Sequence, residues 1–137
     1  MYAAATVTKP DGYYNLGVYA QTDKDYSSAI DYFQKTLALD NEHYPAMLEL
    51  ARMHIEGWGM KKDIPKGVAI MKKVANNASG RVKAIAETNL GYFYLHGLGV
   101  PESKDRARAY LQNAAKAGID AAESMLKQID INHTKDH

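Results

Sequence analysis

Apolar and small residues recur along this 137-residue chain with the period of an α-helix. In three segments they stand at offsets 0, 3, 4, 7 and 8, which places them on one stripe of a helix. The stripes consist of Ala29, Tyr32, Phe33, Thr36 and Leu37, then Gly67, Ile70, Met71, Val74 and Ala75, then Ala107, Tyr110, Leu111, Ala114 and Ala115. A further helix is predicted before each stripe, so the pattern indicates three helix pairs.

Capping and turn residues indicate where these helices begin and end. First helices are predicted over about 13–21, 45–56 and 82–96. Second helices are predicted over about 25–39, from Pro65 to the loop at 76–80, and over about 104–117. Asp11 and Ser103 are predicted N-caps, and Gly57 and Gly97 are predicted to end their helices in the left-handed conformation. Another apolar stripe predicts a last helix from residue 120.

A helix pair of this size cannot bury its apolar stripe alone, so neighbouring pairs are expected to stack. The predicted fold is therefore all-α. It is a right-handed α-α superhelix (solenoid) of three helix-turn-helix repeats plus a C-terminal capping helix. Residues 1–11 are expected to be an extended lead-in, 12–130 the solenoid domain and 131–137 a polar tail.

The turn inside the second and third repeats is longer than the turn inside the first. Leu16 and Ala29 are 13 residues apart, whereas the equivalent residues of the later repeats are 17 apart. The longer turns contain Gly57-Trp58-Gly59 and Gly97-Leu98-Gly99. Helices are predicted on both sides of each turn, and nucleotide-binding motifs need a preceding strand or a following Lys-Ser/Thr. The glycines are therefore interpreted as turn residues with positive φ.

The third repeat resembles a known family. Its stretch Leu90-Gly91-Tyr92-Phe93-Tyr94-Leu95-His96-Gly97-Leu98-Gly99-Val100, followed by Ala107 and by 114–118, resembles the Sel-one-like repeat. The second repeat is similar but has Ala51, His54 and Gly67 where the family usually has Gly, Tyr and Ala. The first looks like a tetratricopeptide repeat in which Ala20 replaces the usual Tyr. The resemblance covers roughly 12–130 and implies a helical scaffold without naming its partner.

The tetratricopeptide frame predicts a concave surface on the first helices. The predicted partner-binding residues are Tyr14, Val18, Gln21, Leu48, Arg52, Ile55, Thr88, Tyr92 and Leu95. Arg52 can pair with a carboxylate, and Tyr92 offers a rigid amphipathic contact. In the alternative interpretation, this face packs on the lead-in segment or on a neighbouring domain.

Composition narrows the classes of partner. The formal net charge is +1, and Lys72-Lys73 and Arg106/Arg108 are interpreted as solvated charge, so nucleic acid is not expected. No apolar run is long enough to span a bilayer, and the absence of cysteine excludes a disulfide framework. The compartment stays open: cytoplasmic, or periplasmic if a leader has been removed. The free protein is expected to be a monomer.

No pattern of catalytic residues is present, so the chain is not expected to be an enzyme and no cofactor is expected. His54 is interpreted as a packing residue. His133 and His137 are four residues apart but lack a carboxylate cluster, so no metal site is predicted. The predicted function is a non-enzymatic adapter that binds a protein or peptide in its concave groove. The alternative is a bacterial immunity or inhibitory regulatory protein that blocks a partner enzyme.

Overall fold

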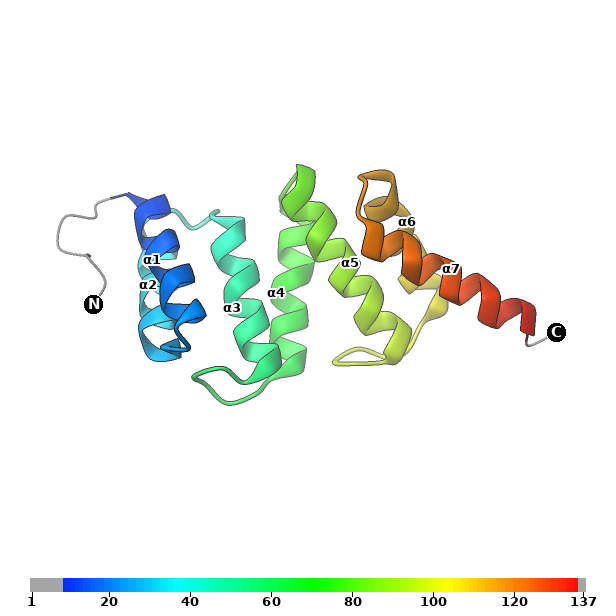
Figure 1. Ribbon diagram of the computed structural model, residues 1–137, viewed down its shortest axis with the longest axis horizontal. Coiled ribbons are helices and arrows are strands. Elements are labelled where there is room, and N and C mark those ends of the chain that lie inside the picture. Colours follow the sequence, from blue (N-terminus) through cyan, green and yellow to red (C-terminus); the bar gives the residue numbers. More distant parts are fainter. Residues whose placement is uncertain (1–8, 136–137) are drawn as a thin grey trace. The chain divides into compact units, whose positions relative to one another are not determined.

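The structure, a computed structural model, describes residues 9–135, and within this range it contains seven α-helices and no strand (Figure 1). The helices are α1 (Pro10–Thr22), α2 (Tyr26–Leu39), α3 (Tyr44–Glu56), α4 (Ile64–Asn77), α5 (Gly80–His96), α6 (Lys104–Lys116) and α7 (Asp120–Lys135). The predicted all-α helical repeat fold is confirmed. Residues 1–8 of the predicted lead-in and residues 136–137 of the predicted tail lie outside the described range.

The helices form two compact units that divide between Asp63 and Ile64. The first unit contains α1, α2 and α3, and the second contains α4, α5, α6 and α7. This division falls inside the second predicted repeat, between its two helices. Each unit has its own buried side chains.

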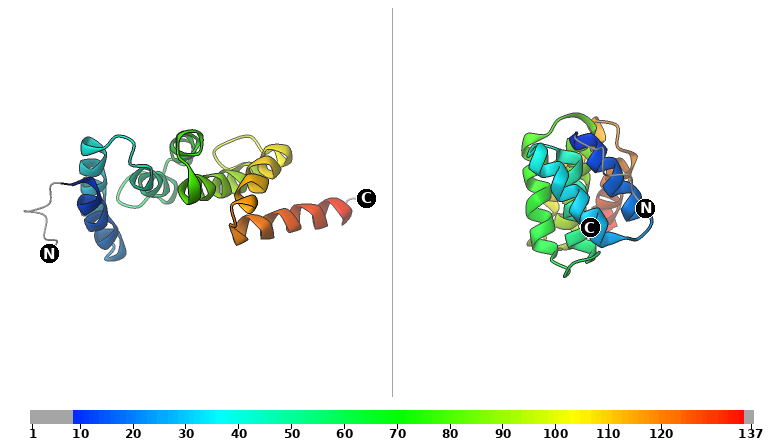
Figure 2. Two further views of the ribbon diagram at one scale, coloured as in Figure 1. Left: turned by 90° about the horizontal axis from the view of Figure 1, so that it is seen from above. Right: turned by 90° about the vertical axis from the view of Figure 1, so that its left-hand side faces the viewer.

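In the first unit, α1 and α2 lie side by side as a tight helix pair, and α3 packs on α2 (Figures 1 and 2). The core contains Ala20, Ala29, Tyr32, Phe33, Ala46 and Met53. Gly17 allows the close approach of the pair, because a Cβ atom there would lie 2.5 Å from Cε1 of Phe33. The phenyl ring of Phe33 is fully buried and therefore occupies the space that the glycine leaves.

In the second unit, α5 packs on both α4 and α6, and α7 packs on α6. Gly91 has the same role as Gly17, because a Cβ atom there would lie 2.5 Å from Cδ2 of the fully buried Leu111. The small residues of the first helices thus permit close packing against a large apolar side chain of the second helices.

The last helix covers the end of the second unit. Ala122 and Ile129 of α7 are buried in one cluster with Leu111 and Ala114 of α6. On the opposite side, Lys127 is exposed and its Nζ lies 3.7 Å from Glu123 Oε1. The helix continues to Lys135, beyond the residue at which a tail was expected to begin. An apolar inner face with a charged outer face suits a terminal helix of a repeat protein.

The helix ends agree with the predicted caps, with one exception. Ser103 Oγ accepts a hydrogen bond from the Arg106 N–H at 3.2 Å, as predicted for an N-cap. The prediction that Asp11 caps the first helix is wrong. The helix begins at Pro10, whose fixed φ suits the first helical position, so that Lys9 becomes the N-cap.

Asp11 instead connects α1 to the residue before α3. Its Oδ1 lies 2.8 Å from Nε2 of His43, while Nδ1 of His43 accepts a hydrogen bond from the Ala46 N–H at 3.2 Å. Since Nδ1 is an acceptor, the neutral ring carries its proton on Nε2 and donates it to Asp11. A histidine therefore caps α3.

Candidate functional site

Of the predicted partner-binding residues in the first unit, Arg52 on α3 is exposed. Its Nη1 lies 3.7 Å from Glu49 Oε2, and its guanidinium carbon lies 5.8 Å from the ring centroid of Trp58. The Trp58 ring stacks in turn on Tyr26 at a centroid distance of 5.4 Å. Arg52 is thus an exposed cation held beside an aromatic pair.

Tyr14 on α1 is half-buried beside the same charges. Its ring lies 5.0 Å from the ring of His43 and 5.9 Å from the ring of Phe33. Burial raises the pKa of the Tyr14 hydroxyl above its ordinary value, and Glu49 raises this pKa further, while Arg52 opposes both. The structure therefore brings Tyr14 and Arg52 into one electrostatic environment.

Two buried polar atoms of this unit have no hydrogen-bond partner among residues 9–135. They are Nε2 of Gln21, a predicted surface residue, and Oε2 of Glu49. The distance from Glu49 to Arg52 is an ion-pair distance and is too long for a hydrogen bond. A buried donor or acceptor without a hydrogen bond lowers the stability of the folded state. A polar group that reached either atom and formed a hydrogen bond would remove this cost. Val18 and Leu48 are partly buried, and Val18 packs on the core.

In the second unit, Tyr92 on α5 is the exposed member of the predicted set, with 42% of its surface accessible. Its ring meets the His96 ring edge to face at 4.6 Å between centroids, and it meets Phe93 at 5.8 Å. Leu95 is partly buried and packs on the cluster around Leu111. Tyr92 is thus an exposed aromatic side chain supported by two neighbouring rings.

Two predicted surface residues, Ile55 and Thr88, are buried. Their exposed fractions are 9% and 7%, and the Thr88 hydroxyl donates a hydrogen bond to the Ala84 carbonyl at 2.8 Å. Each lies four residues after a buried alanine, Ala51 or Ala84, and therefore on the same helix face. The expectation that they contribute to a surface is corrected.

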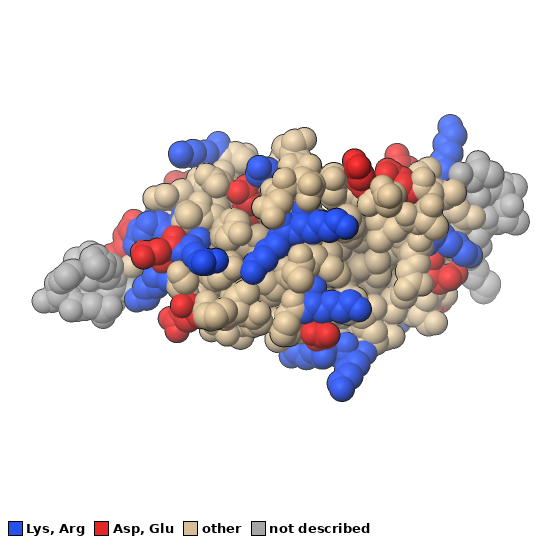
Figure 3. Space-filling view, turned by 180° about the vertical axis from the view of Figure 1, so that it is seen from behind, with Lys and Arg blue, Asp and Glu red and all other residues tan. Residues whose placement is uncertain are grey.

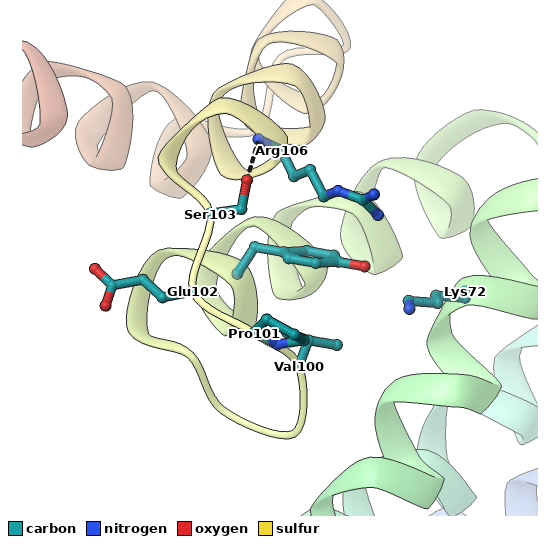
Figure 4. Close-up of a pocket in the computed structure, with 7 residues that line it drawn as sticks. Lys72, Val100, Pro101, Glu102, Ser103 and Arg106 are labelled. Carbon is teal, nitrogen blue, oxygen red and sulfur yellow. Dashed lines mark hydrogen bonds between the residues drawn. The ribbon is translucent and has the colours of Figure 1, made fainter.

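The structure also contains a pocket of about 250 Å³ in the second unit, which the sequence did not reveal (Figure 4). It is lined by Lys72, Tyr94, Val100, Pro101, Glu102, Ser103 and Arg106. From the sequence, Lys72 and Arg106 are expected to be ordinary solvated charge, but both cations lie against the ring of the buried Tyr94. Because Lys72 lies on a different helix, 22 residues before Tyr94, no local motif indicates this grouping.

The described residues contain no group of three His, Asp or Glu side chains that could hold a metal ion. The predicted absence of a site at His133 and His137 concerns side chains that the structure does not describe. None of the described helices is long and apolar enough to cross a membrane. On the face in Figure 3, Lys and Arg side chains are interspersed with Asp and Glu and with uncharged surface.

The repeated helices, the close glycine contacts and the long Gly-x-Gly turns define a helical repeat protein. Three stretches of the chain, residues 10–41, 45–79 and 84–119, match the Sel1 repeat family. The chain belongs to this family, as the resemblance of its third repeat implied. The first repeat, which resembled a tetratricopeptide repeat, also falls within the matched residues.

The solved structures that are similar to this chain include two repeat proteins. One is a Sel1 repeat protein from Oxalobacter formigenes, 28% identical with a TM-score of 0.72 over 88% of this chain and 34% of that one. The other is a protective antigen of uropathogenic Escherichia coli strains with an SLR fold, 27% identical with a TM-score of 0.72 over 83% of this chain and 24% of that one. The chain therefore spans about a third or less of either relative. Proteins of this family are typically non-catalytic scaffolds for protein interactions.

Proposed function

We propose that this chain is a non-enzymatic adapter that binds a protein or peptide through the exposed faces of its first helices. Its contact residues are Arg52, Tyr14 and Gln21 in the first unit, and Tyr92 in the second. Val18, Leu48 and Leu95 contribute apolar surface at the edges of these contacts.

The observation that carries the proposal is the position of Arg52. Its side chain is 55% exposed, yet it is held beside the Trp58 ring and the Glu49 carboxylate. An arginine held in place in this way loses little conformational freedom when it binds a carboxylate, and arginine and aromatic residues dominate the affinity of protein interfaces. In the same unit, Gln21 Nε2 and Glu49 Oε2 are buried and have no hydrogen-bond partner among the described residues, so a partner that reached them would satisfy a donor and an acceptor.

Tyr92 supports the same interpretation in the second unit. A tyrosine can bury a large amphipathic surface against a partner at low entropic cost. The 42% of Tyr92 that is exposed is surface that does not pack within the unit.

The test begins with affinity capture of a partner and continues with calorimetric titration of variants. Arg52→Glu is expected to weaken binding by more than about 2 kcal/mol, because it replaces an attraction with a repulsion. Tyr92→Ala is expected to cost about 1–3 kcal/mol of affinity. Assaying the captured partner for lost activity separates an adapter from an inhibitory protein.

Lys73→Glu is the matched control, because Lys73 is exposed and lies on a second helix. It is expected to leave affinity unchanged, and circular dichroism should show that all variants stay folded. If Lys73→Glu abolishes binding while Arg52→Glu and Tyr92→Ala do not, the assigned surface is wrong.

A further inference from the structure

The pocket of the second unit contains two cations that have no carboxylate partner within the part of the chain that the structure describes. Neither Lys72 nor Arg106 forms an ion pair with a described residue. By contrast, Arg108 on the same helix as Arg106 pairs with Asp130 on the neighbouring helix. Glu102 also lines the pocket, but its carboxylate points away from both cations (Figure 4). The pocket therefore has an uncompensated positive charge.

Both cations are held against one buried ring. Lys72 Nζ lies 5.4 Å and the Arg106 guanidinium carbon 5.6 Å from the ring centroid of Tyr94. Tyr94 is 3% exposed, and its ring stacks on the ring of Tyr110 with 5.8 Å between the centroids, so the Tyr94 ring is held in place by packing. Hydrogen bonding from Lys72 lowers the pKa of the Tyr94 hydroxyl; burial opposes this change, and Arg106 lowers the pKa further. Lys72 comes from α4 and Arg106 from α6, and both side chains extend into the space between these helices (Figure 4).

We propose that this pocket binds a carboxylate group of a peptide between Lys72 and Arg106, the carboxylate coming either from an acidic side chain or from a C-terminus. This site is independent of the proposed contacts at Arg52 in the first unit and at Tyr92 in the second.

The size and shape of the pocket favour a carboxylate. Its volume of about 250 Å³ lies below the range of about 300–1,000 Å³ that is usual for drug-sized ligands, so it fits one small group. The planar guanidinium of Arg106 matches the two oxygens of a carboxylate, and Lys72 supplies a second charge. Val100 and Pro101 give the pocket an apolar wall against which the aliphatic part of such a residue can pack.

The equivalent positions of the second repeat lack this combination. In the alignment of the repeats, Gln34 takes the place of Lys72, His54 the place of Tyr94, and Asp63 the place of Ser103. Lys66 corresponds to Arg106, so one cation remains, but an acidic residue stands three positions before it. The cationic pocket is therefore a property of the third repeat and not of the repeat pattern.

The experiment is a titration of the full chain, labelled with ¹⁵N, followed by NMR. The probes are acetyl-Ala-Ala-Ala with a free C-terminus, acetyl-Ala-Glu-Ala-amide, the neutral acetyl-Ala-Gln-Ala-amide, and inorganic phosphate. We expect saturable shifts of the amide signals of residue 72 and residues 100–106 with one or both carboxylate probes and not with the neutral peptide. The probe that causes them identifies the source of the carboxylate.

Lys72→Gln and Arg106→Gln are each expected to raise the dissociation constant about tenfold, since each removes a charge-assisted hydrogen bond. The control is Arg108→Gln on the same helix, which should bind like the unmodified chain, as should Arg52→Glu. Equal shifts with the neutral peptide, or shifts that survive both pocket variants, would overturn the proposal. Binding of phosphate without either carboxylate peptide would also overturn it.

Discussion

The two long turns, residues 57–63 and 97–103, have the same backbone and different side chains. Both glycines of each turn have positive φ, 72° and 73° in the first turn and 64° and 70° in the second. In each turn the last residue donates its N–H to a carbonyl nine residues earlier. Asp63 donates to His54 at 2.7 Å, and Ser103 donates to Tyr94 at 2.9 Å.

The side chains of the two turns have different roles. Trp58 stands between the first pair of glycines and stacks on Tyr26, whereas Leu98 takes its place in the second turn. The second turn ends at Ser103, which caps α6 and lines the cationic pocket. The spacing of the glycines thus accounts for the path of the backbone, and the residues between and after them decide which groups the turn contacts.

The largest expected effect on stability comes from disturbing the backbone conformation that the two turns share. In Gly99→Ala the new Cβ would lie 2.7 Å from Ile64 Cγ2 and 3.2 Å from the Ile64 carbonyl carbon, at a φ of 70°. Strain and steric overlap together should lower the free energy of unfolding by about 2–4 kcal/mol. Gly80→Ala is the control, since its φ is 62° but nothing lies within 4 Å of the new Cβ. Urea titrations should show a smaller loss for Gly80→Ala, and equal losses would contradict the role given to packing.

A smaller effect is expected when the first turn is given the side chain of the second. Trp58→Leu removes the stack on Tyr26 and the contact with Arg52. It should lower the free energy of unfolding by about 1–2 kcal/mol, because aromatic pairs and cation–π contacts each contribute roughly 0.5–1.5 kcal/mol. The helical circular dichroism spectrum should not change, since the backbone does not depend on Trp58. A large loss of helix would show that the turn needs the indole ring.

Ser103→Ala tests how the second turn ends. It removes the oxygen that accepts from the Arg106 N–H, and loss of an N-cap costs about 0.5–1 kcal/mol at an exposed position. Thermal unfolding should show a small decrease in Tm, which Ser103→Asp should largely restore. Unchanged stability in Ser103→Ala would mean that the cap contributes nothing here.

The smallest effect is confined to alkaline pH. The pKa of Tyr94 is lowered and the pKa of Tyr14 is raised, so the two hydroxyls should lose their protons in different pH ranges. The stability that a lowered tyrosine pKa adds is fully present above the unfolded value near 10.0 and is lost as the pH falls through the folded pKa. Neutral solutions should therefore show no effect.

Ultraviolet absorbance during an alkaline titration measures these proton losses. Lys72→Met should shift the earliest tyrosinate signal to higher pH, and Tyr94→Phe should abolish it. An early signal that persists in Tyr94→Phe would assign the lowered pKa to another tyrosine.

Some of the proposed contact residues could be predicted from the sequence in each unit, because the position of a residue within a repeat indicates its helix face. This reasoning succeeded in predicting that Arg52 and Tyr92 are exposed. It failed for Ile55 and Thr88, which share a face with buried alanines. Neighbouring positions on a helix face different directions, so a shift of one residue in the alignment of the repeats can change a side chain from exposed to buried. The alignment of the repeats is not accurate enough to resolve that difference.

The sequence by itself determined the helices, their repeats and the glycine turns. These depend on local periodicity, on positive φ and on small residues such as Gly17 and Gly91, all of which can be read within one repeat. Only the tertiary structure showed that His43 caps α3 while bonded to Asp11, and that Lys72 and Arg106 meet over Tyr94. Both arrangements join residues that are more than 30 positions apart in the chain, and their distances depend on how the helices pack. Periodicity carries no information about such contacts.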